Sequence, residues 1–590
     1  MNRKLALILA LTLLTGILGA AFNAQRAKAS GTIYIRADGS IDPPDAPIYT
    51  TDNITYTLTG NITADADGIV VERDSIVVDG ASYTVQGTGA YDSKGIELSG
   101  RSNVTIRSME VRTFDYGILL DSSSNNTASG NNITNNYVGI MLLVSSNNNS
   151  ISGNTITGNQ GYGIMLDWSC NNNCMSENNI TNNLGGITLS SSSNNSISGN
   201  NITANNHIGI ALSSSSNNNM SGNKVSNSGV GFQLSSSSNN SISGNVFVGC
   251  GLHVPDSYGN VVVDNWVNGK PLVYLENVSD FKVEDAGQVI LVNCVNMTVK
   301  GSDLSNADIG IQLWKTNNTE ISGNNITNNV FGIMLYFSSN NSISGNNVTA
   351  NKYIGIWLSC ESNNNSFSGN NVTNNDYGIG LDSSSNNTIY HNNFIDNAQQ
   401  VYFDSGYANV WDDGYPSCGN YWSDYNGTDL QSGLYQNDTS CDGIGDTPYT
   451  IDPWVYDHYP LMGMFSDFDA TSDQHVTTIC NSTISGCQFN GTAIMFDVTG
   501  VEGTAGFCRI CVPTSLMNAT FRVFVNGTEV IGNLLPCSNS TYNYLYFNYT
   551  HSTEEVIIIP EFPSFLILSL FMMAALLAVI VYKRKGAHAK

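Results

Sequence analysis

A repeat of 22 to 24 residues is the feature that most constrains how this chain can fold. A glycine followed by Ile or Phe recurs at Gly117, Gly139, Gly163, Gly186, Gly209 and Gly231, and again at Gly310, Gly332, Gly355 and Gly378. A second glycine, in a motif of the Ser-x-Ser-Gly-Asn type, keeps step at Gly153, Gly199, Gly222, Gly244, Gly323, Gly345 and Gly369. A fixed period of this length is typical of solenoids, in which each unit buries its apolar face only against its neighbours.

Apolar residues within each unit follow the period of a β-strand. Pairs such as Ile118 and Leu120 are two residues apart, which places both side chains on one face of a strand. Ile197 and Ile202 mark two further short strands, so each unit contains three strands separated by Asn, Gly and Ser corners. Units of this kind must stack at the ~4.8 Å spacing of paired strands. We therefore predict an all-β protein built as a right-handed parallel β-helix.

Asparagine suits the corners of such a helix. It tolerates the left-handed backbone region, and its amide can hydrogen-bond to the equivalent asparagine of the next coil. Two other repeat folds fit less well. The L-x-x-L-x-L frame of leucine-rich repeats is absent, and a propeller blade needs ~40 residues per unit.

The two ends of the chain predict export and anchoring. Residues 1–29 combine a basic start, an apolar run and the Ala27-Lys28-Ala29 cleavage site of a signal peptide. Residues 564–582 carry no charge and are long enough for a transmembrane helix, and the basic tail 583–590 should remain cytoplasmic. We expect a single-pass protein on the extracellular face of the membrane, or one processed at the C-terminal sorting motif Pro560, Glu561 and Phe562.

Between these ends we predict three regions. Residues 30–67 form an N-terminal strand and cap region, and residues 68–465 form the β-helix, with irregular coils at 246–307 and an acidic end cap at 404–465. Residues 474–556 lose the repeat, and their alternating β-branched and aromatic runs predict a small β-sandwich.

Composition limits the partners. There are 22 Lys and Arg against 48 Asp and Glu, a net charge of −26, which disfavours the phosphate contacts that nucleic-acid binding requires. We therefore expect no nucleic acid as a partner. Twelve cysteines fit an oxidising compartment and favour structural disulfides or buried thiols over a zinc site. Asn-x-Ser/Thr sequons recur throughout, for example at Asn426 and Asn548, and predict a glycoprotein.

The units resemble the parallel β-helix repeats of the NosD-type family, named for a periplasmic copper-binding protein. The resemblance covers residues 60–460, and its most specific part is the segment W-D-D-G-Y-P-S-C-G-N-Y-W-S-D-Y from Trp411, followed by D-G-I-G-D-T-P-Y from Asp442. The same repeats occur in carbohydrate-binding and sugar-hydrolase modules. The Pro-Glu-Phe motif, apolar segment and basic tail also resemble the sorting tails of archaeal surface proteins.

The resemblance raises the question of catalysis and of copper. Sugar-cutting β-helices need acidic residues in adjacent coils, whereas Asp121, Asp167 and Asp382 fall in distant coils. Copper needs clustered His, Met and Cys, but the histidines are scattered over positions 207, 253, 391, 458 and 475. Met141 and Met165, one coil apart and predicted to point outward, are the best copper candidates, and no histidine is in register with them.

We therefore predict no catalytic residues and a non-catalytic carbohydrate-binding, adhesion or envelope-structural role, with glycans as partners. The alternatives left open are an extracellular polysaccharide lyase, hydrolase or epimerase and, less favoured, a copper-binding accessory protein. Six aromatic residues are candidates for stacking against sugar rings: Tyr162, Trp168, Trp314, Tyr336, Tyr353 and Trp357.

Two further predictions concern the helix end. Cys418 and Cys441 both lie in the family-like terminal motif, and we expect them to form a disulfide. The same region is acidic and lacks Lys and Arg, and oxygen ligands on a glycine-bent loop suit Ca²⁺. The candidate Ca²⁺ ligands are Asp424, Asp429, Asp438, Asp442 and Asp446.

Overall fold

The computed structural model describes residues 31–404, 408–518 and 520–561. All its regular elements are β-strands, and none of the described residues forms an apolar helix long enough to span a membrane. The predicted signal peptide, transmembrane helix, basic tail and Phe562 lie outside the described residues. The chain divides into two compact units, one formed by residues 1–276, 285–292 and 304–311 and the other by the remaining residues.

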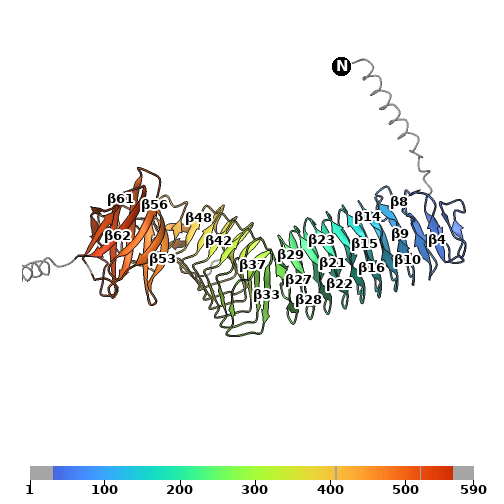
Figure 1. The fold of residues 1–590 in the computed structure, drawn as a ribbon, viewed down its shortest axis with the longest axis horizontal. Helices are drawn as coiled ribbons and strands as arrows, with labels where there is room; N and C mark the ends of the chain where they lie inside the picture. Colours follow the sequence, from blue (N-terminus) through green and yellow to red (C-terminus); the bar gives the residue numbers. More distant parts are fainter. Residues whose placement is uncertain (1–30, 405–407, 519, 562–590) are drawn as a thin grey trace, which may run out of the picture. The chain divides into compact units, whose positions relative to one another are not determined.

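The first unit is a solenoid of three sheets that run along stacked coils, coloured blue to green in Figure 1. Each coil contributes one strand to each sheet, and strands of successive coils pair in parallel. The right-handed parallel β-helix predicted from the repeat is thereby confirmed.

The strands of the first unit are as follows. The first sheet holds, in spatial order, β2 (Ile41–Asp42), β1 (Ile33–Ile35), β6 (Ile69–Val71), β9 (Lys94–Ser99), β12 (Tyr116–Asp121), β15 (Val138–Leu143), β18 (Tyr162–Leu166), β21 (Gly185–Ser190), β24 (Ile208–Ser213), β27 (Val230–Ser235) and β30 (Leu252–His253). The second holds β3 (Ile48–Tyr49), β4 (Thr55–Leu58), β7 (Val77–Asp79), β10 (Thr105–Arg107), β13 (Thr127–Ser129), β16 (Ser150–Ser152), β19 (Cys174–Ser176), β22 (Ser196–Ser198), β25 (Asn219–Ser221), β28 (Ser241–Ser243) and β31 (Val261–Val263). The third holds β5 (Ile62–Thr63), β8 (Thr84–Gln86), β11 (Glu110–Arg112), β14 (Asn132–Thr134), β17 (Thr155–Thr157), β20 (Asn179–Thr181), β23 (Asn201–Thr203), β26 (Lys224–Ser226), β29 (Val246–Val248), β32 (Trp266–Val267), β33 (Lys270–Glu276) and β35 (Gln288–Val292).

The solenoid begins earlier than the repeat pattern indicates. β1 already pairs in parallel with β6, so residues 33–35 belong to the first coil rather than to a separate cap. The predicted irregularity at 246–307 includes a chain reversal: β32 and β33 pair antiparallel across Asn268 and Gly269, both at positive φ. Two successive residues at positive φ are what a two-residue hairpin turn requires.

The repeated glycine of each unit has a steric cause. A Cβ atom on Gly139 would lie 2.5 Å from the carbonyl oxygen of Gly163 in the next coil, and one on Gly209 would lie 2.6 Å from that of Gly231. No real side chain tolerates such distances, so only glycine allows successive coils to approach along this column. The glycine therefore marks a backbone-to-backbone contact that recurs once per coil.

Buried apolar columns fill the interior. Ile118, Ile140 and Ile164 stack in register and are fully buried, as the alternation predicts. Each of the other two sheets adds its own central column, for example Ile151 of β16 and Ile156 of β17. Burial of such columns is the main stabilising contribution in a solenoid, because each coil covers its neighbour.

Buried asparagines form ladders at the corners. Asn178 accepts hydrogen bonds from the backbone N–H and the side-chain amide of Asn154, both at 3.0 Å, and donates to Asn200 Oδ1 at 3.0 Å. Its amide also donates to the carbonyl of Ile151 at 2.9 Å. The predicted asparagine bonding between coils is thus confirmed, and it satisfies the polar groups that the corners bury.

The second unit continues the same three-sheet pattern, with β37 (Ile309–Trp314) contributing residues to both units. Its first sheet includes β40 (Phe331–Tyr336), β43 (Ile354–Ser359), β46 (Tyr377–Leu381) and β49 (Gln399–Phe403). The second holds β34 (Lys282–Val283), β36 (Thr298–Lys300), β38 (Glu320–Ser322), β41 (Ser342–Ser344), β44 (Ser366–Ser368) and β47 (Thr388–Ile389), and the third holds β39 (Asn325–Thr327), β42 (Asn347–Thr349), β45 (Asn371–Thr373), β48 (Asn393–Ile395) and β50 (Tyr421–Trp422). A hairpin of β51 (Tyr449–Asp452) and β52 (Val455–Asp457) follows.

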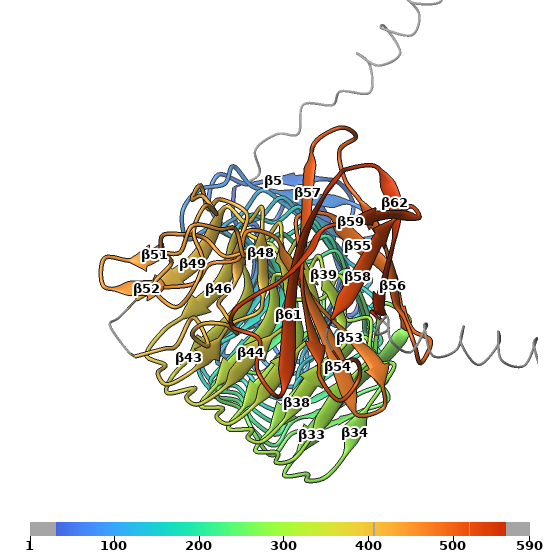
Figure 2. The same ribbon diagram turned by 90° about the vertical axis from the view of Figure 1, so that its left-hand side faces the viewer.

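Two five-stranded antiparallel sheets end the described chain, and Figure 2 shows them in orange and red. One contains β53 (Met464–Thr471), β54 (Gln474–Cys480), β57 (Ala505–Pro513), β61 (Tyr542–Thr550) and β60 (Gly532–Leu534). The other contains β55 (Thr483–Phe489), β56 (Ile494–Thr499), β62 (Thr553–Pro560), β58 (Phe521–Val525) and β59 (Thr528–Val530). Residues of both sheets, including Ile510 and Phe496, belong to one buried apolar cluster.

Candidate functional site

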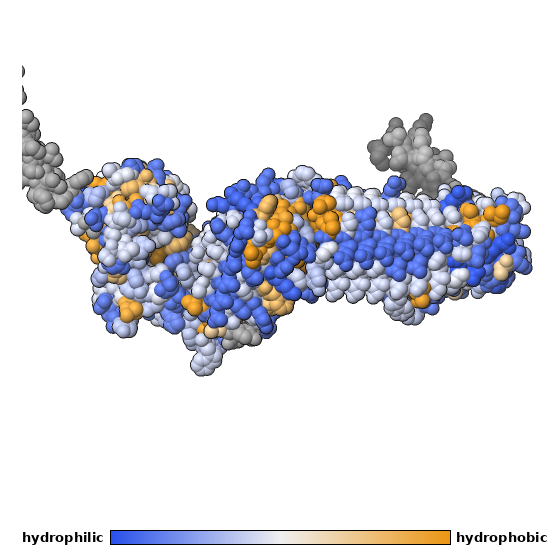
Figure 3. All heavy atoms as spheres, turned by 90° about the horizontal axis from the view of Figure 1, so that it is seen from below, coloured by the Kyte–Doolittle hydropathy of each residue, from blue (hydrophilic) through white to orange (hydrophobic). Residues whose placement is uncertain are grey.

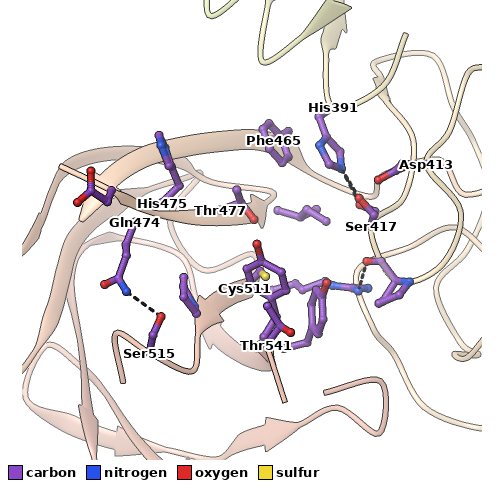
Figure 4. A pocket seen from close by; sticks show the side chains of 17 residues that line it. His391, Asp413, Ser417, Phe465, Gln474, His475, Thr477, Cys511, Ser515 and Thr541 are labelled. Atoms are coloured by element: carbon purple, nitrogen blue, oxygen red, sulfur yellow. Dashed lines mark hydrogen bonds between the residues drawn. The ribbon is translucent and has the colours of Figure 1, made fainter. Parts of the chain in front are cut away.

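A cavity of about 590 Å³ lies in the second unit, between the last coils of its solenoid and the sheet of β54, β57 and β61 (Figure 4). His391, Asp413 and Ser417 line it from the solenoid side. The opposite wall consists of side chains from the antiparallel sheet and its loops: Gln474, His475, Thr477, Arg509, Cys511, Ser515, Thr541, Tyr542 and Tyr544.

Both histidines that line the cavity already contact other groups of the protein. His391 stacks on Phe465 with ring centroids 4.3 Å apart, and its Nε2 lies 2.6 Å from the carbonyl oxygen of Ser417, to which it donates. Burial lowers the pKa of His391, so the ring is neutral at pH 7. His475 is more than half exposed, and its Nδ1 lies 3.1 Å from Asp469.

Cys511 is the cavity residue with the greatest potential for covalent chemistry. Burial raises the pKa of its thiol to about 11, so at neutral pH it is protonated and is a poor nucleophile. With one histidine held by a carbonyl group and the thiol protonated, the cavity has the character of a polar binding site.

Arg509 lines the cavity and places a positive charge beside Asp442 of the acidic cap. Its guanidinium is fully buried and donates to the carbonyl oxygens of Asp442 at 2.9 Å and Pro416 at 2.8 Å, while the Asp442 carboxylate lies 3.8 Å away. The rings of Tyr415 and Tyr544 flank it at 5.9 and 5.1 Å. The positive charge next to the acidic cap therefore comes from Arg509 on strand β57. The sequence of the cap itself did not reveal this contact.

The five aspartates of the predicted Ca²⁺ site do not converge on one point. Asp429 accepts the backbone N–H groups of Asp442 and Gly443 at 2.9 and 2.8 Å. Burial raises the pKa of Asp429 to about 6. Asp424 instead accepts the hydroxyl of Tyr449 at 3.2 Å.

Asp446 is held from the other side of the cap. It accepts the backbone N–H groups of Leu430 and Gln431 and the hydroxyl of Thr428. At Asp438, the backbone carbonyl accepts the N–H of Ser432 at 2.8 Å. No group of three or more His, Cys, Asp or Glu side chains is placed to hold a metal ion within the described residues. Asp429 and Asp446 instead link residues 428–431 to residues 442–446, and the arrangement does not support the predicted Ca²⁺ site.

The predicted disulfide between Cys418 and Cys441 is not formed in the structure, where none of the twelve cysteines is in a disulfide. The Cys418 thiol donates to the carbonyl of Pro416 at 3.2 Å, and the Cys441 thiol donates to that of Asp429 at 3.0 Å. The Cys418 thiol is thus bonded within its own turn, whereas the Cys441 thiol is bonded to a carbonyl 12 residues away in the chain.

Three of the six predicted aromatic residues come together on the outer face of the sheet of β40 and β43. Trp357 stacks on Phe331 at 5.3 Å and meets Tyr336 edge-on at 5.7 Å, and Tyr353 also stacks on Phe331, at 5.8 Å. We call these four residues the aromatic platform. Phe331, which the sequence reasoning missed, is its centre, and it precedes the repeated glycine as Tyr116 and Tyr377 do in their coils.

The platform extends over two more strands. On β46, Gly380 is the partner of Trp357, and a Cβ atom there would lie 3.4 Å from the indole ring. On the next strand, Tyr402 is the partner of Gly380 and meets Tyr377 edge-on at 5.4 Å. Half-exposed rings therefore follow one face across successive coils.

The other three predicted aromatic residues are placed elsewhere. Trp168 is 63% exposed, and no described aromatic ring stacks on it. Tyr162 covers Gly185 of the next coil, whose Cβ atom would meet its ring at 2.5 Å. Trp314 is buried, with the Lys315 ammonium 4.4 Å above its ring.

The donor set does not fit copper. Met141 and Met165 are partners in register, as predicted, but they pack with Leu119 and Val138 in an apolar cluster. Thioether sulfur without an imidazole or thiolate beside it is a weak copper site.

The acidic column that a sugar-cutting enzyme needs is also missing around Asp121. Its register partners are Ser99 in the preceding coil and Leu143 in the following one. Asp382 likewise lies beside a neutral residue, since the hydroxyl of Ser359 donates to it at 2.9 Å. At these positions a pair of carboxylates in adjacent coils, the usual device for glycosidic bond cleavage, does not form.

The chain has weak similarity to several solved structures. A DFA-IIIase from Arthrobacter chlorophenolicus A6, solved in complex with GF2, is 12% identical with a TM-score of 0.26, and the match covers 46% of this chain and 67% of that one. The A-module of the mannuronan C-5 epimerase AlgE4 from Azotobacter vinelandii is 13% identical with a TM-score of 0.24, covering 59% and 91%. A mutant of the periplasmic alginate epimerase AlgG is 13% identical with a TM-score of 0.26, covering 59% and 78%.

A search of curated proteins finds no match. Two segments, residues 45–270 and 249–427, match the family described as periplasmic copper-binding protein (NosD). Together they span residues 45–427, more than half of the chain, and coincide with the stacked coils. This chain therefore belongs to the NosD family.

Proposed function

We propose that this protein is a non-catalytic, carbohydrate-binding β-helix protein of the cell surface, and that glycans bind on the aromatic platform. The observation that carries the proposal is the stacked group Phe331, Tyr353 and Trp357, with Tyr336 at its edge. Tyr353 is 48% exposed, so part of its ring is available to a ligand although the ring also stacks on Phe331.

Such a surface suits sugar rings for physical reasons. An aromatic face attracts the apolar C–H face of a pyranose, and rings already held by stacking lose little conformational entropy on binding. The net charge of −26 disfavours polyanionic ligands. We therefore propose neutral glycans rather than acidic polysaccharides as the partners.

The experiment is to measure binding of the full chain to a panel of neutral and acidic glycans, with two matched tryptophan variants. Trp357→Ala removes the platform residue that contacts both Phe331 and Tyr336, and Trp168→Ala removes an exposed tryptophan outside the platform. Buried aromatic anchors are typically worth about 2 kcal/mol, so we expect Trp357→Ala to weaken binding at least tenfold and Trp168→Ala to leave it unchanged. Equal effects of both variants, or no binding by the parent chain, would contradict the proposal.

The absence of catalysis is tested on the same panel. Incubation with alginate-like and neutral polysaccharides should release no unsaturated or reducing ends over many hours. Steady release that a heat-denatured control lacks would favour a lyase or hydrolase instead.

We also propose that the chain is exported and anchored by residues 564–582, and that residues 464–560 act as a β-sandwich spacer at the membrane. The support is the signal-like N-terminus, the uncharged C-terminal segment and the shared core of the two antiparallel sheets. Protease treatment of intact cells should remove the solenoid, and it should leave a soluble cytoplasmic control protein undamaged. Protection of the solenoid until lysis would overturn this topology.

A further inference from the structure

Each coil presents asparagines of two kinds. Ladder asparagines such as Asn149 and Asn195 are 2% and 1% exposed, and their amides are bonded within the ladders. The residue directly before a ladder asparagine occupies the corner between the first and second sheets. At this corner Asn148 and Asn194 are exposed and adopt positive φ.

Side chains alternate between the two faces of a strand, and this alternation decides which kind of asparagine can begin an Asn-x-Ser/Thr sequon. Two residues after Asn149 comes Ile151, the buried centre of β16, so a ladder asparagine cannot begin a sequon. Two residues after Asn148 comes Ser150, the outward first residue of the same strand. None of the buried asparagines among the described residues begins a sequon, since none has Ser or Thr two residues later.

Corner asparagines with a complete sequon form a column on each unit. They are Asn53, Asn103, Asn125, Asn148, Asn194 and Asn239 in the first unit, and Asn296, Asn340, Asn364 and Asn386 in the second. All are exposed, with φ between 54° and 60°. Figure 3 shows that one face of the first unit carries a continuous hydrophilic stripe, as in-register polar residues produce.

A second set of sequons lies on the strands of the third sheet. Asn201 donates to Asn179 at 2.8 Å, Asn347 donates to Asn325 at 2.8 Å, and Asn325 donates to Asp303 at 3.1 Å. At the corners, the Asn296 side chain donates to Asp280 at 3.2 Å, and the other corner side chains form no such bond to described residues. A corner amide nitrogen other than that of Asn296 is therefore available for modification in the folded chain, whereas the amide nitrogens of Asn201, Asn325 and Asn347 must first leave their neighbours.

We infer that the corner column is the N-glycosylation surface of this protein. The donor would be an oligosaccharide linked to a lipid phosphate or pyrophosphate, as exporting cells use. The corner amide nitrogen attacks the anomeric carbon, a carbon–nitrogen bond forms, the sugar–phosphate oxygen bond breaks, and the amide loses one proton as the lipid phosphate departs. The inference needs export of the chain but not glycan binding by the platform.

Gaps in the column provide a gain-of-function test. Asn172 occupies the corner position with φ of 57° but is followed by Asn173 and Cys174, so its sequon is incomplete. Cys174 is the register partner of Ser150 and Ser196. Cys174→Thr therefore completes a sequon at a position that already accepts a hydroxyl side chain, and Cys174→Ala is the matched control.

The experiment expresses the full chain in a host that secretes and N-glycosylates proteins, followed by enzymatic deglycosylation in ¹⁸O-labelled water and peptide mass spectrometry. We expect labelled aspartate at corner positions, little label at Asn201, Asn325 and Asn347, and a new labelled site at Asn172 only in Cys174→Thr. Unmodified corners in a verified exported chain, or equal occupancy of corner and strand sequons, would overturn the inference.

A second pair of variants separates the loss of a glycan from misfolding of the chain. Ser366→Ala and Asn364→Gln both destroy the sequon at Asn364, and Ser366→Ala leaves the asparagine itself in place. Both should lose the mass of one glycan from the parent chain and retain its melting temperature. Retention of the glycan in either variant would contradict the assignment of Asn364.

Discussion

Asp308 shows how a single buried acid can set the pH dependence of this protein. Its carboxylate accepts the backbone N–H groups of Gly231 and Gly251 at 2.8 and 3.0 Å in the first unit. Burial raises the pKa of Asp308 to about 7, although the two hydrogen bonds favour the charged form. The carboxyl group is therefore protonated in the folded state at pH values where it is ionised in the unfolded chain.

Stability should consequently fall as pH rises between about 4 and 7. In that window the folded state binds more protons than the unfolded state, so the free energy of unfolding decreases with pH, by at most about 4 kcal/mol for a shift of this size. Asp308→Asn keeps an oxygen for the two glycines and cannot ionise. We expect its thermal midpoint to vary less with pH and to exceed that of the parent above pH 7. Parallel pH profiles of the two proteins would refute this.

Arg509 is the second residue with a clear expected effect. Removal of its guanidinium by Arg509→Met leaves the carbonyls of Asp442 and Pro416 and the buried Asp442 carboxylate without their cation. Losses of this kind cost about 3 to 5 kcal/mol. The control is Arg522→Met, whose partner Glu529 is about half exposed and whose loss should leave the denaturation midpoint unchanged. Urea denaturation followed by tyrosine and tryptophan fluorescence compares the two.

At the scale of elements, the asparagine ladder and its exposed neighbours make a test within one coil. Asn178→Ala removes the acceptor of two hydrogen bonds from Asn154 and the donor to Ile151 and Asn200, leaving buried polar groups unpaired. We expect a loss of about 2 to 3 kcal/mol in unfolding free energy. Asn179→Ala, one residue further on but exposed, should cost less than about 0.5 kcal/mol. Chemical denaturation of both variants checks the difference, and equal costs would show that burial of the ladder is unimportant.

Elements also show how far sequence reasoning reaches. The Ile-x-Leu alternation and the glycine period predicted the sheets, the core columns and the corner asparagines, because each coil repeats the same local constraints. The five aspartates predicted to bind Ca²⁺ are a different case, because their contacts do not repeat along the chain. Asp429 accepts an N–H group 13 residues away and Asp446 accepts one 15 residues away, and Arg509 reaches the cap from a strand more than 60 residues later. Contacts between distant segments leave no periodic mark in the sequence.

The aromatic platform could be predicted from the sequence only in part. Tyr353 and Trp357 were predictable because aromatic residues at solenoid faces stand out, but their convergence on Phe331 depends on register between coils. A register table built from the repeated glycines would have found Phe331, since it immediately precedes Gly332 in the same way that Tyr377 precedes Gly378.

At the scale of the whole molecule, the two compact units predict unfolding in more than one step. Solenoids depend on contacts between neighbouring coils, so a defect is felt locally. We expect at least two transitions by differential scanning calorimetry, with Asn178→Ala lowering one and Arg509→Met lowering another. A single transition shifted by both variants would show that the chain unfolds as one cooperative body.

The ladders have a direction, and this gives the protein a way to change length over evolution. Each ladder amide donates to the asparagine of the following coil, and the series from Asn126 ends at Asn260, whose amide nitrogen has no partner among the described residues. A coil copied into the middle of the series offers an acceptor to the coil before it and a donor to the coil after it. Gene duplication can therefore lengthen or shorten the protein by whole coils without any compensating substitution.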